Sequence, residues 1–148
     1  MQTIGSGSEC TVFKTGKGIL KCYDSKSDAQ QACELQQKLS YFDLAPEVYT
    51  NARRHKVDDE TLWGYYSEEA ELLPECECDE VIIDECWSCE STREAREDII
   101  EAIQYWTGLE YVDFHVGNFG FVIRDCMRVM VCIDTGVKGF IELEKEMC

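Results

Sequence analysis

Residues 2–23 constrain the fold more than any other part of the chain, because glycine and serine interrupt three short apolar runs there. The runs cover residues 3–4, 11–13 and 19–23. Each is too short for a helix, and the Gly and Ser residues between them favour tight turns. We therefore expect three short antiparallel strands at the start of the chain.

A helical pattern follows the third run. Ser27 is the expected N-cap, and apolar residues then recur at mixed three- and four-residue spacings up to Leu39. We expect this helix to end before Tyr41, because Pro46 requires extended backbone in the residue before it.

The next two apolar runs, residues 48–49 and 62–66, predict two further strands separated by the polar segment 51–60. Together with the first three strands, they give a five-stranded antiparallel sheet with one helix, complete by about Ala70. The expected fold class is therefore α+β.

The rest of the chain divides into an acidic, cysteine-rich connector and a region with a second helix. The helix is expected from Ser91 to Gly108, and a β-hairpin is expected from residues 120–123 and 127–133. The predicted units are thus residues 1–70, 71–90 and 91–148.

The charge of the chain restricts its partners. Its 148 residues include 14 Lys and Arg against 30 Asp and Glu, a formal charge of −16. Phosphate backbones and anionic lipids require clustered cations, so we expect neither nucleic-acid nor membrane binding. A protein partner with a basic surface fits this charge, and so does imitation of DNA.

The N-terminus has no basic and apolar leader, so we expect a cytoplasmic location. In that compartment the ten cysteines are expected to be reduced thiols or metal ligands. Cys22 and Cys132 lie inside apolar runs and are expected to be small buried hydrophobes.

Lys21 is a charged residue in an otherwise apolar strand, and alternation allows it to point inward. A buried lysine is costly unless it meets an anion. Glu34, on the first helix, is a candidate for that anion, and a solvated glutamate is the alternative. The sequence Gly5-Ser6-Gly7 allows close approach of backbone to a phosphate, although a hairpin turn has the same composition.

Three oxygen-bearing side chains stand beside apolar runs in the C-terminal region: Asp113, Asn118 and Asp134. Carboxylate and amide oxygens are ligands that Mg²⁺ prefers, and phosphoryl transfer also needs a carboxylate near the attacking hydroxyl. Asx turns and a hairpin end are the structural alternative.

In these features the chain resembles the protein kinase-like superfamily over nearly its whole length. Residues 4–12 are similar to the glycine-rich loop, with Val12 as its valine and Cys10 in place of the third glycine. Residues 19–21 resemble the strand-three lysine motif. The resemblance implies that the ATP site includes Gly5, Ser6, Gly7, Val12 and Lys21, that Glu34 pairs with Lys21, and that the backbone from Glu68 to Ala70 and the apolar side chains of Val12, Leu72 and Ile133 contact adenine.

The same resemblance implies that Asp113 is the catalytic base and that Asn118 and Asp134 hold Mg²⁺. The loop departs from the protein-kinase pattern, since Tyr111 replaces His and His115 replaces Lys. Asp-x-His-x-x-Asn is similar to the aminoglycoside and choline phosphotransferases. The chain ends twelve residues after Gly136, so it resembles miniature phage or bacterial-effector kinases that lack most of the helical substrate lobe.

Four cysteines of the connector form a Cys-x-Cys and a Cys-x-x-Cys pair: Cys76, Cys78, Cys86 and Cys89. Four thiolates at these spacings suit a tetrahedral Zn²⁺ site. The neighbouring carboxylates oppose thiolate formation, and free thiols in an acidic loop are the alternative.

The sequence therefore predicts an ATP- and Mg²⁺-dependent miniature Ser/Thr-type kinase that acts on a partner protein or on itself. The alternative is a kinase-like binding protein, an acidic inhibitor or DNA mimic, that blocks a basic partner without catalysis. Phosphorylation of a small metabolite fits the catalytic loop, but the helical lobe that normally encloses such substrates is missing.

Overall fold

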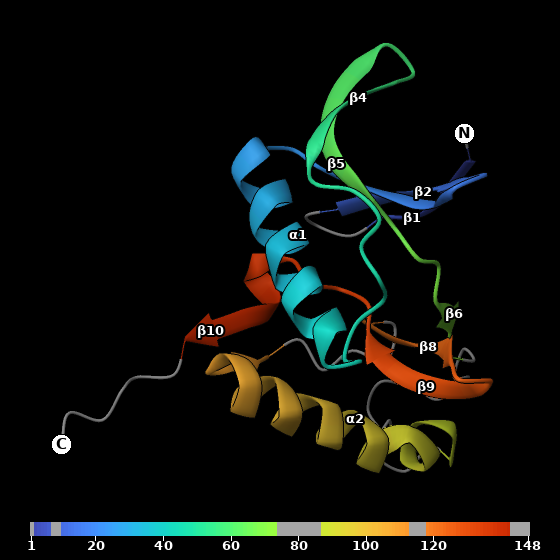
Figure 1. The fold of residues 1–148 in the computed structure, drawn as a ribbon, viewed down its shortest axis with the longest axis vertical. Helices are drawn as coiled ribbons and strands as arrows, with labels where there is room; N and C mark the ends of the chain where they lie inside the picture. Colours follow the sequence, from blue (N-terminus) through green and yellow to red (C-terminus); the bar gives the residue numbers. More distant parts are fainter. Residues whose placement is uncertain (1, 7–9, 74–86, 113–117, 143–148) are drawn as a thin grey trace, which may run out of the picture.

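A computed structural model describes residues 2–6, 10–73, 87–112 and 118–142. Within these residues the fold is α+β, as expected, with two α-helices and three antiparallel sheets (Figure 1). In chain order the elements are β1 (Gln2–Ser6), β2 (Cys10–Thr15), β3 (Gly18–Tyr23), α1 (Lys26–Tyr41), β4 (Arg53–Val57), β5 (Glu60–Ser67), β6 (Glu71–Leu72), α2 (Trp87–Thr107), β7 (Leu109–Tyr111), β8 (Phe119–Arg124), β9 (Met127–Cys132), the 3-10 helix η3 (Val137–Gly139) and β10 (Phe140–Glu142).

The largest sheet has five strands in the order β1-β2-β3-β5-β4, and all neighbours are antiparallel. Its first three strands are those expected from the glycine- and serine-interrupted runs. Strand β3 is central, and every residue from Ile19 to Tyr23 is buried. Helix α1 packs against β3 and β5 and covers one face of this sheet (Figure 1).

The predicted fourth strand is wrong. Val48 forms only an isolated bridge with Ser67. The fourth strand is β4, which lies within the polar segment 51–60 that was expected to separate two strands. Asp58 and Asp59 have φ of 47° and 68°, so they form the tight turn that joins β4 to β5. Strand β4 is an edge strand, which explains why its side chains are mostly polar and exposed.

Helix α1 begins earlier and ends later than expected. Its N-cap is Ser25, whose side chain accepts a hydrogen bond of 3.1 Å from the backbone N–H of Asp28. Ser27 lies in the first turn, where its hydroxyl accepts from Gln31 Nε2 at 2.9 Å. The helix continues through Tyr41. Its buried side consists of Ala29, Ala32, Cys33, Gln36 and Leu39.

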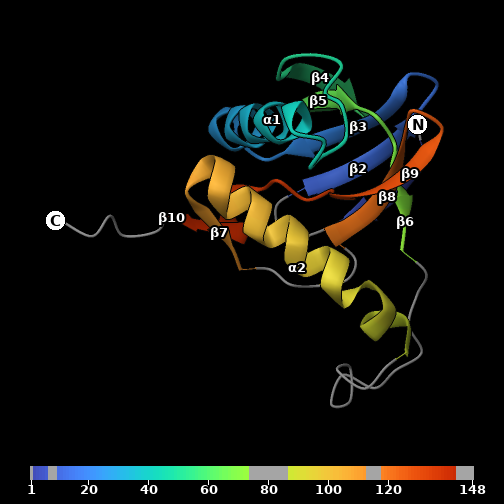
Figure 2. The same cartoon turned by 60° about the horizontal axis from the view of Figure 1, so that its bottom comes forward.

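The C-terminal region contains the predicted hairpin, β8–β9, whose turn residues Asp125 and Cys126 both have positive φ. Strand β6 pairs with β8, and β7 pairs with β10, two pairings that the sequence did not predict. Helix α2 begins at Trp87 rather than Ser91 and lies beside the hairpin (Figure 2). Neither helix of the described ranges combines the length and apolar character that crossing a membrane requires.

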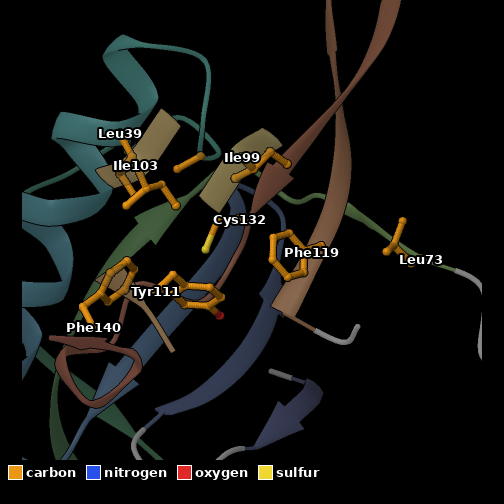
Figure 3. Packing of buried hydrophobic residues seen from close by; sticks show 9 residues of the cluster. Leu39, Leu73, Ile99, Ile103, Tyr111, Phe119, Cys132 and Phe140 are labelled. Carbon is orange, nitrogen blue, oxygen red and sulfur yellow. The ribbon is translucent and has the colours of Figure 1, made fainter. Parts of the chain in front are cut away.

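The main hydrophobic core lies between the C-terminal half of α1, helix α2 and the hairpin (Figure 3). Tyr111 is fully buried there and contacts the rings of Phe119 and Phe140. Because Cys132 ends β9 inside this core, the chain just beyond β9 is held against the sheet and α1. The other members of the cluster are Leu39, Ala45, Leu73, Ile99 and Ile103.

Candidate functional site

Lys21 is a buried cation at the middle of the largest sheet. It pairs with Val12 of β2 and Tyr65 of β5, and its exposed fraction is 4%. Burial lowers the pKa of Lys21, because it removes the ammonium from water. Nearby thiols, Cys10 first, and the carboxylate of Asp134 act in the opposite direction and raise this pKa, but burial has the larger effect.

The Lys21 ammonium is held by neutral oxygens. Nζ donates to Gln36 Oε1 at 3.0 Å and to the backbone carbonyl of Ile133 at 2.6 Å. No described carboxylate forms an ion pair with it. An ammonium has three N–H donors, so these two bonds leave one donor without an acceptor among the described residues.

Gln36 is the hub of the hydrogen bonds around Lys21, and it is fully buried. Its Oε1 also accepts from the Tyr65 hydroxyl at 2.7 Å. Its Nε2 donates to the Pro46 carbonyl at 2.9 Å and to Ser67 Oγ at 2.7 Å. All four hydrogen-bonding positions of the amide are therefore used.

Thr135 joins this network from the segment that follows β9. Its hydroxyl donates to the Ala32 carbonyl of α1 at 3.0 Å and lies 3.5 Å from the Tyr65 hydroxyl. The set formed by Lys21, Gln36, Tyr65, Ser67 and Thr135 is called the Lys21 centre below. It joins β3, α1, β5 and residues 133–136 through buried polar groups.

The expected pairing of Glu34 with Lys21 is wrong. Glu34 is exposed, and the residue of α1 that contacts Lys21 is Gln36. The helical period explains this outcome, because Gln36 follows Ala32 by four residues and precedes Leu39 by three, on the buried side of α1. The run of buried positions in α1 was the sequence signal for Gln36. Tyr65 lay in the predicted strand 62–66 and Thr135 directly follows Asp134, but sequence reasoning gave no site role to Tyr65, Ser67 or Thr135.

Asn118 and Asp134 lie close together at the end of the β8–β9 hairpin. The backbone N–H of Ile133 donates to the Asn118 carbonyl at 2.8 Å, which places Asn118 beside the residue before Asp134. Asp134 is half-buried, and its Oδ1 accepts from the Gly136 N–H at 3.0 Å. Asp113 lies outside the described residues, so its role as base stays a prediction.

The predicted phosphate loop and hinge are described in part. Gly5 and Ser6 belong to β1, where they pair with Val12 and Thr11, and Gly7 lies outside the described residues. Val12 is half-buried beside Lys21 in the β2–β3 pair. Gly5, Val12 and Lys21 therefore lie next to one another across strands β1, β2 and β3.

Glu68 and Ala70, which bound the predicted hinge, follow β5 in the chain. The backbone N–H of Glu68 is already used, because it donates to the Glu47 carbonyl at 2.8 Å. The Glu68 carboxylate is also used, since it accepts from both terminal nitrogens of Arg124 at 2.6 and 2.9 Å. Ala70 is half-buried, and its Cβ lies 3.3 Å from the position that a Cβ on Gly120 would occupy.

The cysteines around the Lys21 centre are protonated thiols rather than nucleophiles. Burial raises the pKa of Cys10 to about 11 and that of Cys132 to about 12. Cys22 and Cys132 are buried, as expected, and Cys33 is buried as well. Of the proposed zinc ligands, Cys76, Cys78 and Cys86 lie outside the described residues, and the side chain of Cys89 in α2 is not described either.

Within the ranges that the structure describes, no three or more His, Cys, Asp or Glu side chains gather as a metal site. No family model matches the chain, and no curated protein matches its sequence. Function is therefore inferred from the Lys21 centre and the side chains beside it.

Proposed function

We propose that the chain binds ATP with Mg²⁺ at the Lys21 centre and acts as a kinase-like phosphotransferase. The observation that carries this proposal is the state of the Lys21 ammonium. It is buried, it has two neutral hydrogen-bond partners, and no described carboxylate forms an ion pair with it. A phosphate oxygen would accept from its remaining N–H and supply the missing negative charge.

The topology supports the kinase-like part of this proposal. The resemblance implies a five-stranded antiparallel sheet and one helix, with the lysine on the third strand. The sheet order β1-β2-β3-β5-β4, the helix between β3 and β4 in the chain, and the position of Lys21 on β3 agree with that expectation. Lys21 Nζ donates to the carbonyl of Ile133, the residue before Asp134. This contact keeps Asp134 near Lys21, which suits a residue that would hold Mg²⁺ beside the phosphates.

The donor set near Lys21 fits Mg²⁺. Proteins usually bind this ion through one or two side-chain oxygens and the phosphates of a nucleotide. Asp134 and Asn118 would supply the protein oxygens, and the bound ion would neutralise charge on the phosphates. Asp113 would accept the proton of the attacking hydroxyl.

Calorimetry of ATP binding tests the nucleotide site. With Mg²⁺ present, we expect Lys21→Met to weaken ATP binding by about tenfold or more, because a charge-assisted hydrogen bond is lost. Lys56→Met is the matched control, because Lys56 is an exposed lysine of β4 in the same sheet. Equal affinity in the wild type and Lys21→Met would contradict the proposal. Asp134→Asn provides a second variant that leaves the Lys21 hydrogen bonds intact.

Gln36 favours a second candidate, a nucleotide-binding protein in which phosphoryl transfer is dispensable. In protein kinases the strand-three lysine forms an ion pair with a helix glutamate, and transfer depends on that pair. Here the corresponding contact is to a neutral amide. Such a protein would act through its surface, like the acidic inhibitor that the sequence offers as an alternative.

Transfer of a labelled γ-phosphate separates the two candidates. A working kinase incorporates label into itself or into an added protein, and Asp113→Ala abolishes that incorporation. ATP binding by the wild type without any incorporation would favour the binding protein. Incorporation that is unchanged in Asp113→Ala would exclude Asp113 as the base.

A further inference from the structure

Four aromatic side chains at the C-terminal ends of the two helices form a continuous ladder. Tyr41 meets Phe42 edge to face at 5.1 Å, Phe42 stacks on Trp106 at 4.2 Å, and Trp106 meets Tyr105 edge to face at 4.9 Å between ring centroids. The first two residues end α1 and the other two belong to the last turn of α2. We call these four residues the aromatic ladder.

Three of the four side chains of the aromatic ladder are exposed, and Phe42 is half-buried. Tyr41 is 83% exposed, Tyr105 77% and Trp106 48%. Leu39 of α1 and Ile103 of α2, each two residues before the first ladder residue of its helix, pack in the main core and so fix the two helix ends relative to each other. A contiguous, preformed apolar surface of this kind is typical of a binding site.

Two aromatic side chains outside the ladder, Trp63 and Phe121, are covered by cations of the protein itself. Lys26 and Arg54 lie over the ring of Trp63 at 5.3 and 5.8 Å, and Arg128 lies over Phe121 at 4.2 Å. Over the four rings of the aromatic ladder, by contrast, the described part of the chain places no lysine or arginine. Phe42 and Trp106 cover one face of each other by stacking, so Tyr41 and Tyr105 are the rings that the described residues leave most available to a cation from another molecule.

A row of carboxylates on α2 leads to the ladder. Glu94, Asp98, Glu101 and Tyr105 follow one another at spacings of four, three and four residues, so they share one side of the helix. All four are exposed, and none of the three carboxylates forms an ion pair with a cation in the described ranges. This face therefore carries negative charge that no lysine or arginine of the described residues pairs with.

We propose that the aromatic ladder and this carboxylate row bind an arginine-rich segment of a partner protein. Arginine is the side chain that uses both parts of the surface, because its planar guanidinium stacks on aromatic rings and pairs with carboxylates. The net charge of −16 adds long-range attraction for such a segment. Residues 94–105 of α2 span about 16 Å, which an extended peptide of about five residues matches. This inference does not depend on nucleotide binding at Lys21.

The test uses a fluorescent peptide of about six residues in which arginine alternates with serine, measured by anisotropy at physiological salt. We expect the double variant Tyr41→Ala/Tyr105→Ala to bind it about tenfold more weakly than the wild type. Tyr49→Ala, which truncates a half-exposed tyrosine outside the ladder, should bind it like the wild type. Replacing arginine by lysine in the peptide should also weaken binding, because lysine does not stack in the same way.

The carboxylates are tested by Asp98→Asn/Glu101→Gln against Asp58→Asn/Glu60→Gln, a pair of equal charge change at the β4–β5 turn. The first pair should weaken binding several-fold and the second should not. Equal weakening by both pairs, or wild-type affinity in the ladder variant, would overturn the proposal in favour of unspecific attraction to an acidic protein. Circular dichroism of each variant verifies that the fold is kept. Absence of binding by the wild-type chain would also overturn it.

Discussion

Lys21 and Arg124 are two cations with different kinds of hydrogen-bond partner, neutral oxygens for Lys21 and a carboxylate for Arg124. Arg124 lies near the surface, where both terminal nitrogens contact the Glu68 carboxylate and Nε lies 3.7 Å from Asp43 Oδ1. Lys21 is buried and contacts only an amide oxygen and a backbone carbonyl among described residues. Arg124 therefore has a carboxylate partner within the protein, whereas no carboxylate of the described residues forms an ion pair with Lys21.

The pKa shifts follow this difference. Hydrogen bonding to Arg124 lowers the pKa of Glu68, and hydrogen bonding to Glu68 raises that of Arg124. Burial instead lowers the pKa of Lys21, so its charged form is disfavoured in the folded protein. The Arg124–Glu68 ion pair is complete in itself and links β8 to the segment that follows β5. A buried cation that forms no ion pair with the described carboxylates is instead suited to an anionic ligand.

The largest expected effect is on stability and comes from replacing Gln36, the residue that connects the hydrogen bonds of the Lys21 centre. Gln36→Leu removes the partners of Lys21 Nζ, the Tyr65 hydroxyl, the Pro46 carbonyl and Ser67 Oγ together. We expect a loss of about 3 to 5 kcal/mol in the free energy of unfolding, because a buried charge and several polar groups lose their partners. Urea unfolding measures it.

The control for this change is Gln37→Leu. Gln37 is exposed, and the one described hydrogen bond of its side chain runs from Nε2 to Asn51 Oδ1 at 3.4 Å. The Gln37→Leu substitution should change the free energy of unfolding by less than about 0.5 kcal/mol. A similar loss in both variants would mean that the Lys21 network is unimportant for stability.

A smaller loss in the free energy of unfolding is expected when the backbone around Lys21 is displaced and its side chain is left unchanged. A Cβ at Gly64 would lie 2.5 Å from the Lys21 carbonyl oxygen and 2.9 Å from Cys22 Sγ. Gly64→Ala should therefore cost about 1 to 3 kcal/mol by overpacking. Gly16→Ala, where no atom lies within 4 Å of the added Cβ, should have little effect. Thermal unfolding of the two variants compares them directly.

The smallest expected effect concerns the Arg124 ion pair. Glu68→Gln should cost about 0.5 to 1 kcal/mol near neutral pH, because solvent screens a half-exposed pair. The pKa of Glu68 is lowered in the folded state, so its contribution is present above its usual value of 4.5 and is lost as the pH falls through the lowered value.

The difference in unfolding free energy between the wild type and Glu68→Gln should accordingly shrink in acid. Glu60→Gln is the control, because Glu60 is exposed at the β4–β5 turn. A difference that stays constant as the pH falls below 4.5 would exclude an ionised Glu68 as its source.

The sequence predicted the elements that have a strong local period. Lys21 in an apolar strand was expected to point inward, and it is buried together with every residue from Ile19 to Tyr23. The β8–β9 hairpin was expected from two apolar runs and a short turn, and only its ends moved by a residue. These features depend on residues close together in the chain.

The features that were missed depend on distant residues. Glu34 was expected to pair with Lys21 because it is charged. Gln36 contacts Lys21 instead, because Gln36 lies on the buried side of α1. Strand β4 is polar because it is an edge strand, so its sequence carried little apolar signal. Thr135 reaches Ala32 across 103 positions in the chain, a contact that only the folded arrangement creates.

The central claim is that the Lys21 ammonium binds an anionic ligand. NMR titration of labelled lysine side chains measures the pKa of this group directly. In the free protein the pKa of Lys21 should lie below its usual value of 10.5, because burial disfavours the charge. On addition of ATP and Mg²⁺ it should rise, because phosphate stabilises the charged form. A pKa of Lys21 that is the same with and without ATP and Mg²⁺ would contradict the account.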